Sequence, residues 1–217
     1  MLLLYIASGI AIAVVIGLVI SSMNKKKKAK SEKRAATVSG ANVTNDLSQV
    51  FEGGVFEVPP FGTQLSSIQT YVKTRHRYSD GEMSWYELAC DYEGRQLNVE
   101  WEREGQSLSV SVGFDDENPT LETLGITEKN LSDMDEAETG TFEWDSVTWK
   151  YANSEELSFF EGNGDEEETF YGWDFQTENG DRFISIEKWP GDAQFYVYAT
   201  YAVDPKRIEV FDGGTAS

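Results

Sequence analysis

The residues best suited to chemistry in this chain are carboxylates close to tryptophans, on stretches where polar and apolar side chains alternate. Glu100 precedes Trp101, and Glu187 lies two residues before Trp189. Two acids that flank a glycosidic bond can hydrolyse it, and the same residue types bind cations through charge and aromatic faces. The candidate binding residues on these stretches are Trp85, Glu87, Glu100, Trp101, Trp173, Glu187 and Trp189.

A structural role competes with both chemistries for the two glutamates. Glu100 and Glu187 take the polar, outward phase near the ends of their predicted strands. Arginines follow or precede them within a few residues, at Arg95, Arg103 and Arg182. We therefore expect surface salt bridges at these positions, and we predict no catalytic residue.

Other reactive residue types are scarce. His76 is the only histidine and stands between two arginines, which disfavour a protonated imidazole, so we expect a structural or exposed histidine. Cys90 follows the inward phase of its strand and is expected to be a small buried side chain. One His and one Cys cannot build an ordinary zinc site, and the chain has no glycine-rich phosphate loop. We predict no metal and no cofactor.

An acidic loop is the one further candidate for binding a cation. It runs from Asp165 to Glu168 in the sequence GNGDEEE. Its carboxylates lack the alternating spacing of a calcium loop. A solvated loop is the simpler interpretation, and whether it binds a cation stays open.

The elements that must position these residues are strands. In SWYELACDY, residues Tyr86, Leu88 and Cys90 fall on one face and Glu87 on the other, which is the period of two that a half-buried strand shows. Two predicted meanders result, with one short helix between Thr120 and Met134. The predicted strands are 84–92, 96–102 and 107–112 in the first meander, 142–154 and 156–164 between the meanders, and 171–177, 182–189 and 193–203 in the second.

The two meanders align with each other. GRQLNVEW and DRFISIEKW match Arg95 with Arg182 and Glu100 with Glu187, and a tryptophan follows each glutamate. This predicts an internal duplication of about residues 70–115 and 140–211. The expected fold is all-β and mainly antiparallel, with two related β-meander modules packed together, one short helix and an N-terminal transmembrane helix.

At this point the chain resembles a known family. WYELACDYEGRQLNVEWEREG, a Leu-Gly-Ile segment and YGWDFQTENGDRFISIEKWPGDAQFYVYATYAVDPKRIEVF together resemble the bacterial family of domain of unknown function 4178, from about Gly53 to Phe211. The resemblance implies a role among proteins of bacterial envelope and membrane-stress assemblies, and it brings no catalytic activity. A membrane-tethered chain departs from the soluble members.

An apolar run opens the chain. Residues 2–20 carry no charge and are long enough, at about 1.5 Å per residue, to span the roughly 30 Å apolar layer of a bilayer. A cleaved signal peptide is the alternative, but its basic residues should precede the apolar run. Here they follow it, and they are expected to stay in the cytoplasm and contact anionic lipid: Lys25, Lys26, Lys27, Lys28 and Lys30.

Charge then separates the chain into parts. Residues 1–45 carry seven basic side chains and one acidic one, which leaves a net charge of −26 on residues 46–217. We predict a transmembrane anchor (1–23), a basic flexible tether (24–45) and a cytosolic acidic β domain (46–217). An acidic domain repels phosphate backbones, so nucleic-acid binding is not expected.

Two functions fit these expectations. The favoured one is a membrane-tethered, non-enzymatic interaction module at the cytoplasmic face of the inner membrane, which captures a protein partner or a cationic ligand. The alternative is a glycoside-type hydrolase that uses Glu100 and Glu187 in a cleft between the two modules. The distinguishing feature is whether these carboxylates share a cleft.

The predicted topology can be tested with a reporter fused after Ser217. Because the lysines resist translocation, the reporter should stay protected when protease is added to spheroplasts and become digested after the membrane is permeabilised. Digestion in intact spheroplasts would place the acidic domain outside and contradict the prediction.

Overall fold

Two long strands organise this fold, β2 (Ile68–Ser79) and β7 (Val147–Phe160). The computed structural model describes residues 46–214, which are mostly antiparallel β-sheet and therefore all-β, as predicted. The remaining elements are η1 (Leu47–Gln49), β1 (Val55–Val58), β3 (Ser84–Tyr92), β4 (Arg95–Glu104), β5 (Ser107–Phe114), η2 (Asp115–Glu117), α2 (Leu121–Leu124), α3 (Glu128–Ala137), β6 (Thr141–Trp144), β8 (Glu167–Gln176), β9 (Arg182–Lys188), β10 (Tyr196–Ala202), η3 (Pro205–Arg207) and β11 (Glu209–Asp212).

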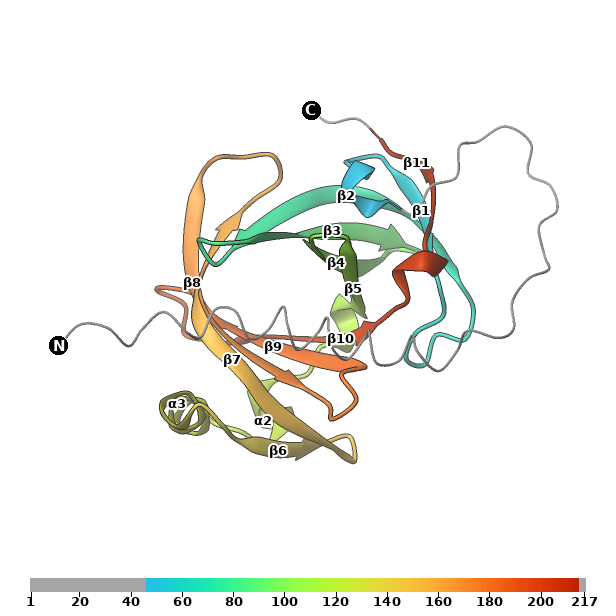
Figure 1. The fold of residues 1–217 in the computed structure, drawn as a ribbon. Helices are drawn as coiled ribbons and strands as arrows, with labels where there is room; N and C mark the ends of the chain where they lie inside the picture. The colour runs from blue at the N-terminus through green and yellow to red at the C-terminus, as the bar shows by residue number, and fades with distance from the viewer. Residues whose placement is uncertain (1–45, 215–217) are drawn as a thin grey trace.

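The strands form one sheet that closes on itself. Their order is β11-β1-β2-β3-β4-β5-β10-β9-β8-β7-β6, and β2 pairs with β7 in addition (Figure 1). This extra pairing closes an eight-stranded barrel from β2, β3, β4, β5, β10, β9, β8 and β7, with β1, β11 and β6 continuing beyond it. A barrel of eight strands leaves an interior that side chains fill or that one small ligand occupies.

Both long strands change partners along their length. The first part of β2 pairs with β1, and its last residues pair with β7; likewise the first part of β7 pairs with β6. Each strand has an irregularity between these parts, at Val72/Thr74 in β2 and at Tyr151/Asn153 in β7. Bulges bend a strand and increase its twist, so one strand can pair with different neighbours along its length.

The order of strands β1–β10 is symmetric: β1 to β5 follow one another inwards from one end, and β6 to β10 follow one another inwards from the other. A duplication would produce this order. β1–β5 form one half of the barrel region and β6–β10 the other. The halves meet through short ladders, three residue pairs between β2 and β7 and two between β5 and β10. Ladders within a half are longer, with ten pairs between β7 and β8. The shared origin of the halves stays a prediction.

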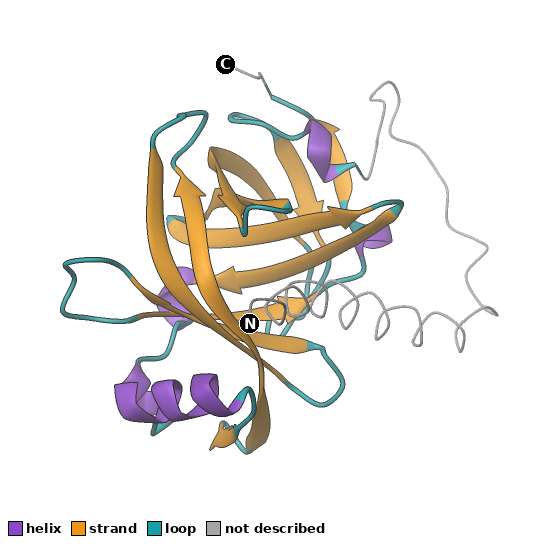
Figure 2. Ribbon diagram, turned by 60° about the vertical axis from the view of Figure 1, so that its left-hand side comes forward, coloured by secondary structure: helices purple, strands orange, loops and turns teal. Residues whose placement is uncertain are grey.

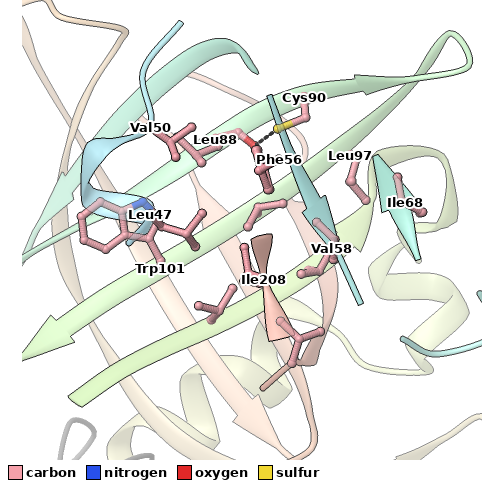
Figure 3. Packing of buried hydrophobic residues seen from close by; sticks show 14 of the residues in the cluster. Leu47, Val50, Phe56, Val58, Ile68, Leu88, Cys90, Leu97, Trp101 and Ile208 are labelled. Atoms are coloured by element: carbon pink, nitrogen blue, oxygen red, sulfur yellow. Dashed lines mark hydrogen bonds between the residues drawn. The ribbon is translucent and has the colours of Figure 1, made fainter. Parts of the chain in front are cut away.

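The first hydrophobic core lies outside the barrel wall. Leu88 and Cys90 of β3 and Leu97 of β4 turn away from the interior and pack under η1, β1 and β11 (Figure 3). All three side chains are fully buried, as the period-two pattern predicted. Burial raises the pKa of the Cys90 thiol, so this residue behaves as the small buried side chain that we expected.

The second core mirrors this arrangement in the other half. Ile184 and Ile186 of β9 and Phe175 of β8 pack against Leu131 of α3 and Phe142 of β6. The helices lie outside the strands, on the face away from the barrel interior (Figure 2). Helix is present where one short helix was predicted, but as two helices, α2 and α3, and α3 extends past Met134 to Ala137. Gly125 ends α2 in the left-handed conformation.

Some sequence expectations were wrong. The stretch 142–154 is a hairpin and not one strand: β6 ends at Trp144, Asp145 and Ser146 form a two-residue turn at positive φ, and β7 then continues to Phe160. Strands β1 and β2 were missed. No helix among residues 46–214 is long and apolar enough to cross a membrane, and the predicted anchor and tether lie outside the described residues.

The β2–β7 seam can be tested with a disulfide. Ser79 and Ser158 are paired across it, and the roughly 4.5–5.5 Å between paired Cα atoms suits a disulfide. Ser79→Cys with Ser158→Cys should form an intramolecular bond on oxidation and raise the unfolding midpoint, because the bond closes a long loop. Mass spectrometry and melting curves measure both effects, with Ser158→Cys alone as control. Failure to form the bond would contradict the closed barrel.

Candidate functional site

The barrel encloses a cavity of about 360 Å³. Alternation in the strands places apolar side chains in the two outer cores and polar side chains around this lumen. Seven carboxylates line it, and none of the described lining residues is lysine, arginine or histidine. The lining acids are Asp80, Glu87, Glu100, Glu102, Glu155, Asp174 and Glu187.

Glu87 and Glu100 come from neighbouring strands of the first half. They are directly paired in the β3–β4 ladder, where cross-strand partners have Cβ atoms about 4.5–5.5 Å apart. Neither side chain has a hydrogen bond or ion pair within residues 46–214. The Glu100 side chain is exposed, and the surface it exposes borders the lumen inside the ring of strands.

Asp174 and Glu187 occupy the corresponding strands of the second half. Asp174 accepts a hydrogen bond of 2.6 Å from the Ser185 hydroxyl. Glu187 is only 7% exposed, and its Oε2 accepts a hydrogen bond of 2.9 Å from Nε1 of Trp189. Its Oε1 has no such partner in the described part of the chain. In the ladder, Glu187 faces Gly172 and Asp174 faces Ser185, so the two acids are diagonal neighbours.

Enclosure changes the acidity of these groups. Burial, and then the charge of Asp115, raises the pKa of Glu87 to about 7. Burial and the neighbouring carboxylates, Glu87 first among them, raise the pKa of Glu100 to about 8. The pKa of Glu187 is also raised to about 8, mainly by burial and against the lowering effect of the Trp189 bond. Burial raises the pKa of Asp174 as well.

Aromatic rings complete the lumen. Tyr78 of β2 stacks on Trp85 of β3, with ring centroids 5.8 Å apart, and its ring edge meets Phe170 of β8. Tyr198 of β10 lies on the same side as Ser185, its ladder partner. Burial raises the pKa of both tyrosines, so both hydroxyls keep their protons and can donate hydrogen bonds.

An outer groove adjoins the lumen. It has a volume of about 490 Å³ and is lined by Glu168, Thr169, Trp189, Pro190, Asp192, Tyr196 and Tyr198. Trp189 stacks on Phe170, with centroids 4.7 Å apart, while its indole nitrogen holds Glu187. Tyr198 lines both the groove and the lumen. Trp189 and Tyr198 therefore separate the solvent-facing groove from the interior carboxylates.

The structure brings most of the predicted binding residues together. The lumen is lined by Trp85, Glu87, Glu100, Trp101 and Glu187, and Trp189 holds Glu187 from the groove side. Trp101 packs in the first core against Tyr86, and Trp173 packs in the second core against Tyr171. The predicted lipid contacts, Lys25, Lys26, Lys27, Lys28 and Lys30, lie outside the described residues.

The predicted salt bridges of the glutamates were wrong. Arg95 pairs with Asp116 and Glu117, Arg103 with Asp46, and Arg182 with Asp145. The reason is the strand period itself: Arg95 and Arg103 have odd positions in β4 and Glu100 an even one, so they point to opposite faces. The same holds in β9 for Arg182 and Glu187.

His76 and the acidic loop are not among the residues that line the cavity. His76 pairs with Glu87 in the β2–β3 ladder but does not line the cavity; its Nδ1 accepts a hydrogen bond from the Gly162 amide, and its ring packs on Phe159. Burial lowers its pKa. Asp165–Glu168 lie at the β7–β8 hairpin, and no group of three potential metal ligands converges among residues 46–214.

Sequence reasoning missed Asp174, Tyr78, Tyr198 and Ser185. The signal for Asp174 was present, because the alignment that matches Glu100 with Glu187 also matches Glu87 with Asp174. Tyr78 was missed because β2 was not recognised as a strand. Tyr198 lies in a strand where nearly every residue is aromatic or apolar, so the alternation that marks a lumen face is absent.

The raised pKa values predict how stability depends on pH. Between about pH 7 and about pH 8 the folded lumen still holds protons that the unfolded glutamates have already lost, so the free energy of unfolding should fall as pH rises and level off towards pH 9. The lowered pKa of His76 has the opposite effect and makes the fold more stable as pH rises. That change lies below this window, because the ordinary histidine pKa is 6.5 and that of His76 is lower.

Melting curves across this range measure the effect. Glu87→Gln with Glu100→Gln should flatten the pH dependence and raise the midpoint at the alkaline end. The matched control is Glu57→Gln with Glu209→Gln, a cross-strand glutamate pair on β1 and β11 that does not line the lumen. An unchanged slope in the lumen variant would contradict the assigned acidities.

Comparison with known proteins places the chain in a family. Residues 64–205 match the family described as domain of unknown function (DUF4178), which covers well over half of the chain and both halves of the barrel. No curated protein and no solved structure matches the chain. The resemblance seen in the paired Trp/Glu hairpins is thereby confirmed, and the chain belongs to the family of domain of unknown function 4178.

Proposed function

We propose that this protein is a membrane-tethered, non-enzymatic binding module that takes a cationic organic ligand into its barrel lumen. The observation that carries the proposal is the lining: seven carboxylates and several aromatic rings surround one cavity, with no basic side chain among the described lining residues. As these carboxyls ionise, the lumen gains negative charge that the protein does not itself neutralise. A cation with apolar substituents would neutralise it and fill the space.

Energetics support this kind of ligand. Carboxylates that lack partners lose solvation on enclosure, and a cation restores a favourable interaction in a site where screening is weak. A cation over an aromatic face contributes about 0.5–2 kcal/mol. Tyr78, Trp85 and Tyr198 supply such faces next to Glu87 and Glu187.

Duplication and tethering belong to the same proposal. The two barrel halves arose from one β-meander unit, and the palindromic strand order supports this origin. Residues 2–20 anchor the chain in the bacterial inner membrane, and the lysines after them keep the acidic domain in the cytoplasm. There the module acts in envelope or membrane-stress assemblies, as the family resemblance implies.

A glycoside hydrolase is the second candidate, because Glu100 and Glu187 line the same cavity. Hydrolysis by two carboxyls needs one protonated and one ionised group, which requires surroundings that separate their pKa values. Here both values are raised to about 8. Binding of a cation needs no such separation, so the geometry favours the binding module.

The test uses the full chain in neutral detergent micelles and three small probes of equal length: butylammonium, butan-1-ol and butyrate. Calorimetry and tryptophan fluorescence should detect butylammonium alone, and its affinity should rise with pH as the lumen carboxyls ionise. Glu87→Gln with Glu100→Gln should weaken binding by at least about tenfold. The control Glu57→Gln with Glu209→Gln should bind as the unaltered protein does.

Two results would contradict the proposal. Equal binding of the neutral and cationic probes would show that charge has no part in recognition. Turnover of aryl glycosides that disappears in both Glu100→Gln and Glu187→Gln, with the fold retained in circular dichroism, would favour the hydrolase.

A further inference from the structure

Four of the seven lumen acids form two pairs on opposite walls. Going round the barrel, β3 and β4 are followed by β5 and β10, then by β9 and β8, then by β7 and β2. Two strands therefore separate the β3/β4 wall from the β8/β9 wall in either direction. Figure 1 shows β3 and β4 across the interior from β9. Glu87 and Glu100 belong to the first wall, Asp174 and Glu187 to the second.

The first pair has no partner of its own. Glu87 and Glu100 are direct cross-strand neighbours, and like charges in that position repel each other. Nothing basic among the lining residues offsets them. A single ammonium group between the two carboxylates would offset their charge, because it donates hydrogen bonds in several directions.

The second pair is held in place but is incomplete. Glu187 lines the lumen and is more than nine-tenths buried; Trp189 donates to one of its oxygens, and the other has no hydrogen-bond donor from residues 46–214. Asp174 is oriented by Ser185. Both carboxylates are therefore positioned by their own strands, and one oxygen of Glu187 lacks a donor from the described residues.

Aromatic rings also line the lumen, beside polar residues such as Asp80 and Glu155. Tyr78 of β2 and Phe170 of β8 both border it, and their rings meet edge to face with centroids 6.0 Å apart. Aromatic side chains pack well against a short aliphatic segment of a ligand and poorly against a hydrated polar segment. The lumen thus offers paired carboxyl groups on two facing walls and aromatic rings beside them.

From this arrangement, and resting on the proposed function, we propose that the lumen ligand carries two ammonium groups joined by an aliphatic chain, with one group at Glu87/Glu100 and the other at Asp174/Glu187. The ligand class is the linear aliphatic diamines and their longer polyamine relatives. Recognition depends on the separation of the two charges, and a compact divalent metal ion has no such separation.

The experiment compares monoamines with diamines of the same chain length, using full-length protein in neutral detergent micelles at fixed ionic strength. The probes are butylamine against diaminobutane and hexylamine against diaminohexane, with magnesium chloride as a compact dication. At least one diamine should bind about tenfold or more tighter than its monoamine, since a second close charge pair contributes on that scale. Magnesium should not displace it.

Two lumen variants test each wall separately. Glu87→Gln with Glu100→Gln, and Asp174→Asn with Glu187→Gln, should each remove the preference for the diamine and leave binding near the level of the monoamine. Glu57→Gln with Glu209→Gln removes two charges from a glutamate pair outside the lumen and should keep the preference. Circular dichroism of each variant establishes that it is folded, and the comparison in the unaltered protein stands without the variants.

The possible failures are distinguishable. If monoamines and diamines bind equally and the lumen variants weaken both, the cationic-ligand function holds and the two-ammonium inference is wrong. If no amine binds, the proposed function is wrong as well. If magnesium competes fully, or if the control pair outside the lumen abolishes the preference, recognition rests on net charge and the inference is overturned.

Discussion

The alternation of side chains along β3, β4, β8 and β9 is the constraint on which this structure depends. Each of these strands has one strongly apolar face, and that face is buried outside the barrel, under η1, β1 and β11 in one half and under α2, α3 and β6 in the other. The opposite face then has no place except the barrel interior. The stability of two well-packed cores offsets the cost of enclosing carboxylates that have no basic partner. The outer faces of these strands supply the apolar cores, which leaves the polar faces to line the lumen.

Period-two reasoning identified which residues share a face, and it failed to identify which face is enclosed. Leu88, Cys90, Leu97 and Val99 are buried as predicted. Glu100 and Glu187 were assigned to solvent because their face is polar, yet the ladders β2–β7 and β5–β10 close that face into a lumen. Closure rests on five residue pairs far apart in sequence, and no local pattern encodes it. The expected ion pairs with arginines do not form for a simpler reason. The arginines and the glutamates point to opposite faces of their strands, although they are close in sequence.

Arg75 and the lumen glutamates lie on opposite faces of the sheet. Arg75 of β2 is buried in the first core, where its guanidinium lies 4.2 Å from the ring centroid of Tyr86 and donates to the carbonyl oxygens of Ser48 and Val50. Desolvation lowers its pKa, although Tyr86 partly opposes that effect. An arginine is thus buried among aromatic rings and carbonyls while glutamates in the lumen lack a base. A pairing of the two would need one of them to cross the sheet, which the strand geometry forbids.

The weakest connections of the barrel coincide with the place where a ligand would act. The two halves are joined by short ladders, whereas each half has its own core and long internal ladders. Opening at the β2–β7 seam therefore disrupts few hydrogen bonds, which is the kind of partial opening expected at low free energy, whereas Tyr201 and Val203 pack in the first core across the β5–β10 seam. A ligand that contacts the β3/β4 wall and the β8/β9 wall at once adds interactions between the halves. Binding would then favour the closed barrel, because a ligand stabilises the state in which it makes more contacts. The distance between the β3/β4 wall and the β8/β9 wall therefore sets the length of the ligand. Because the ligand contacts both walls, its binding also favours closure of the barrel.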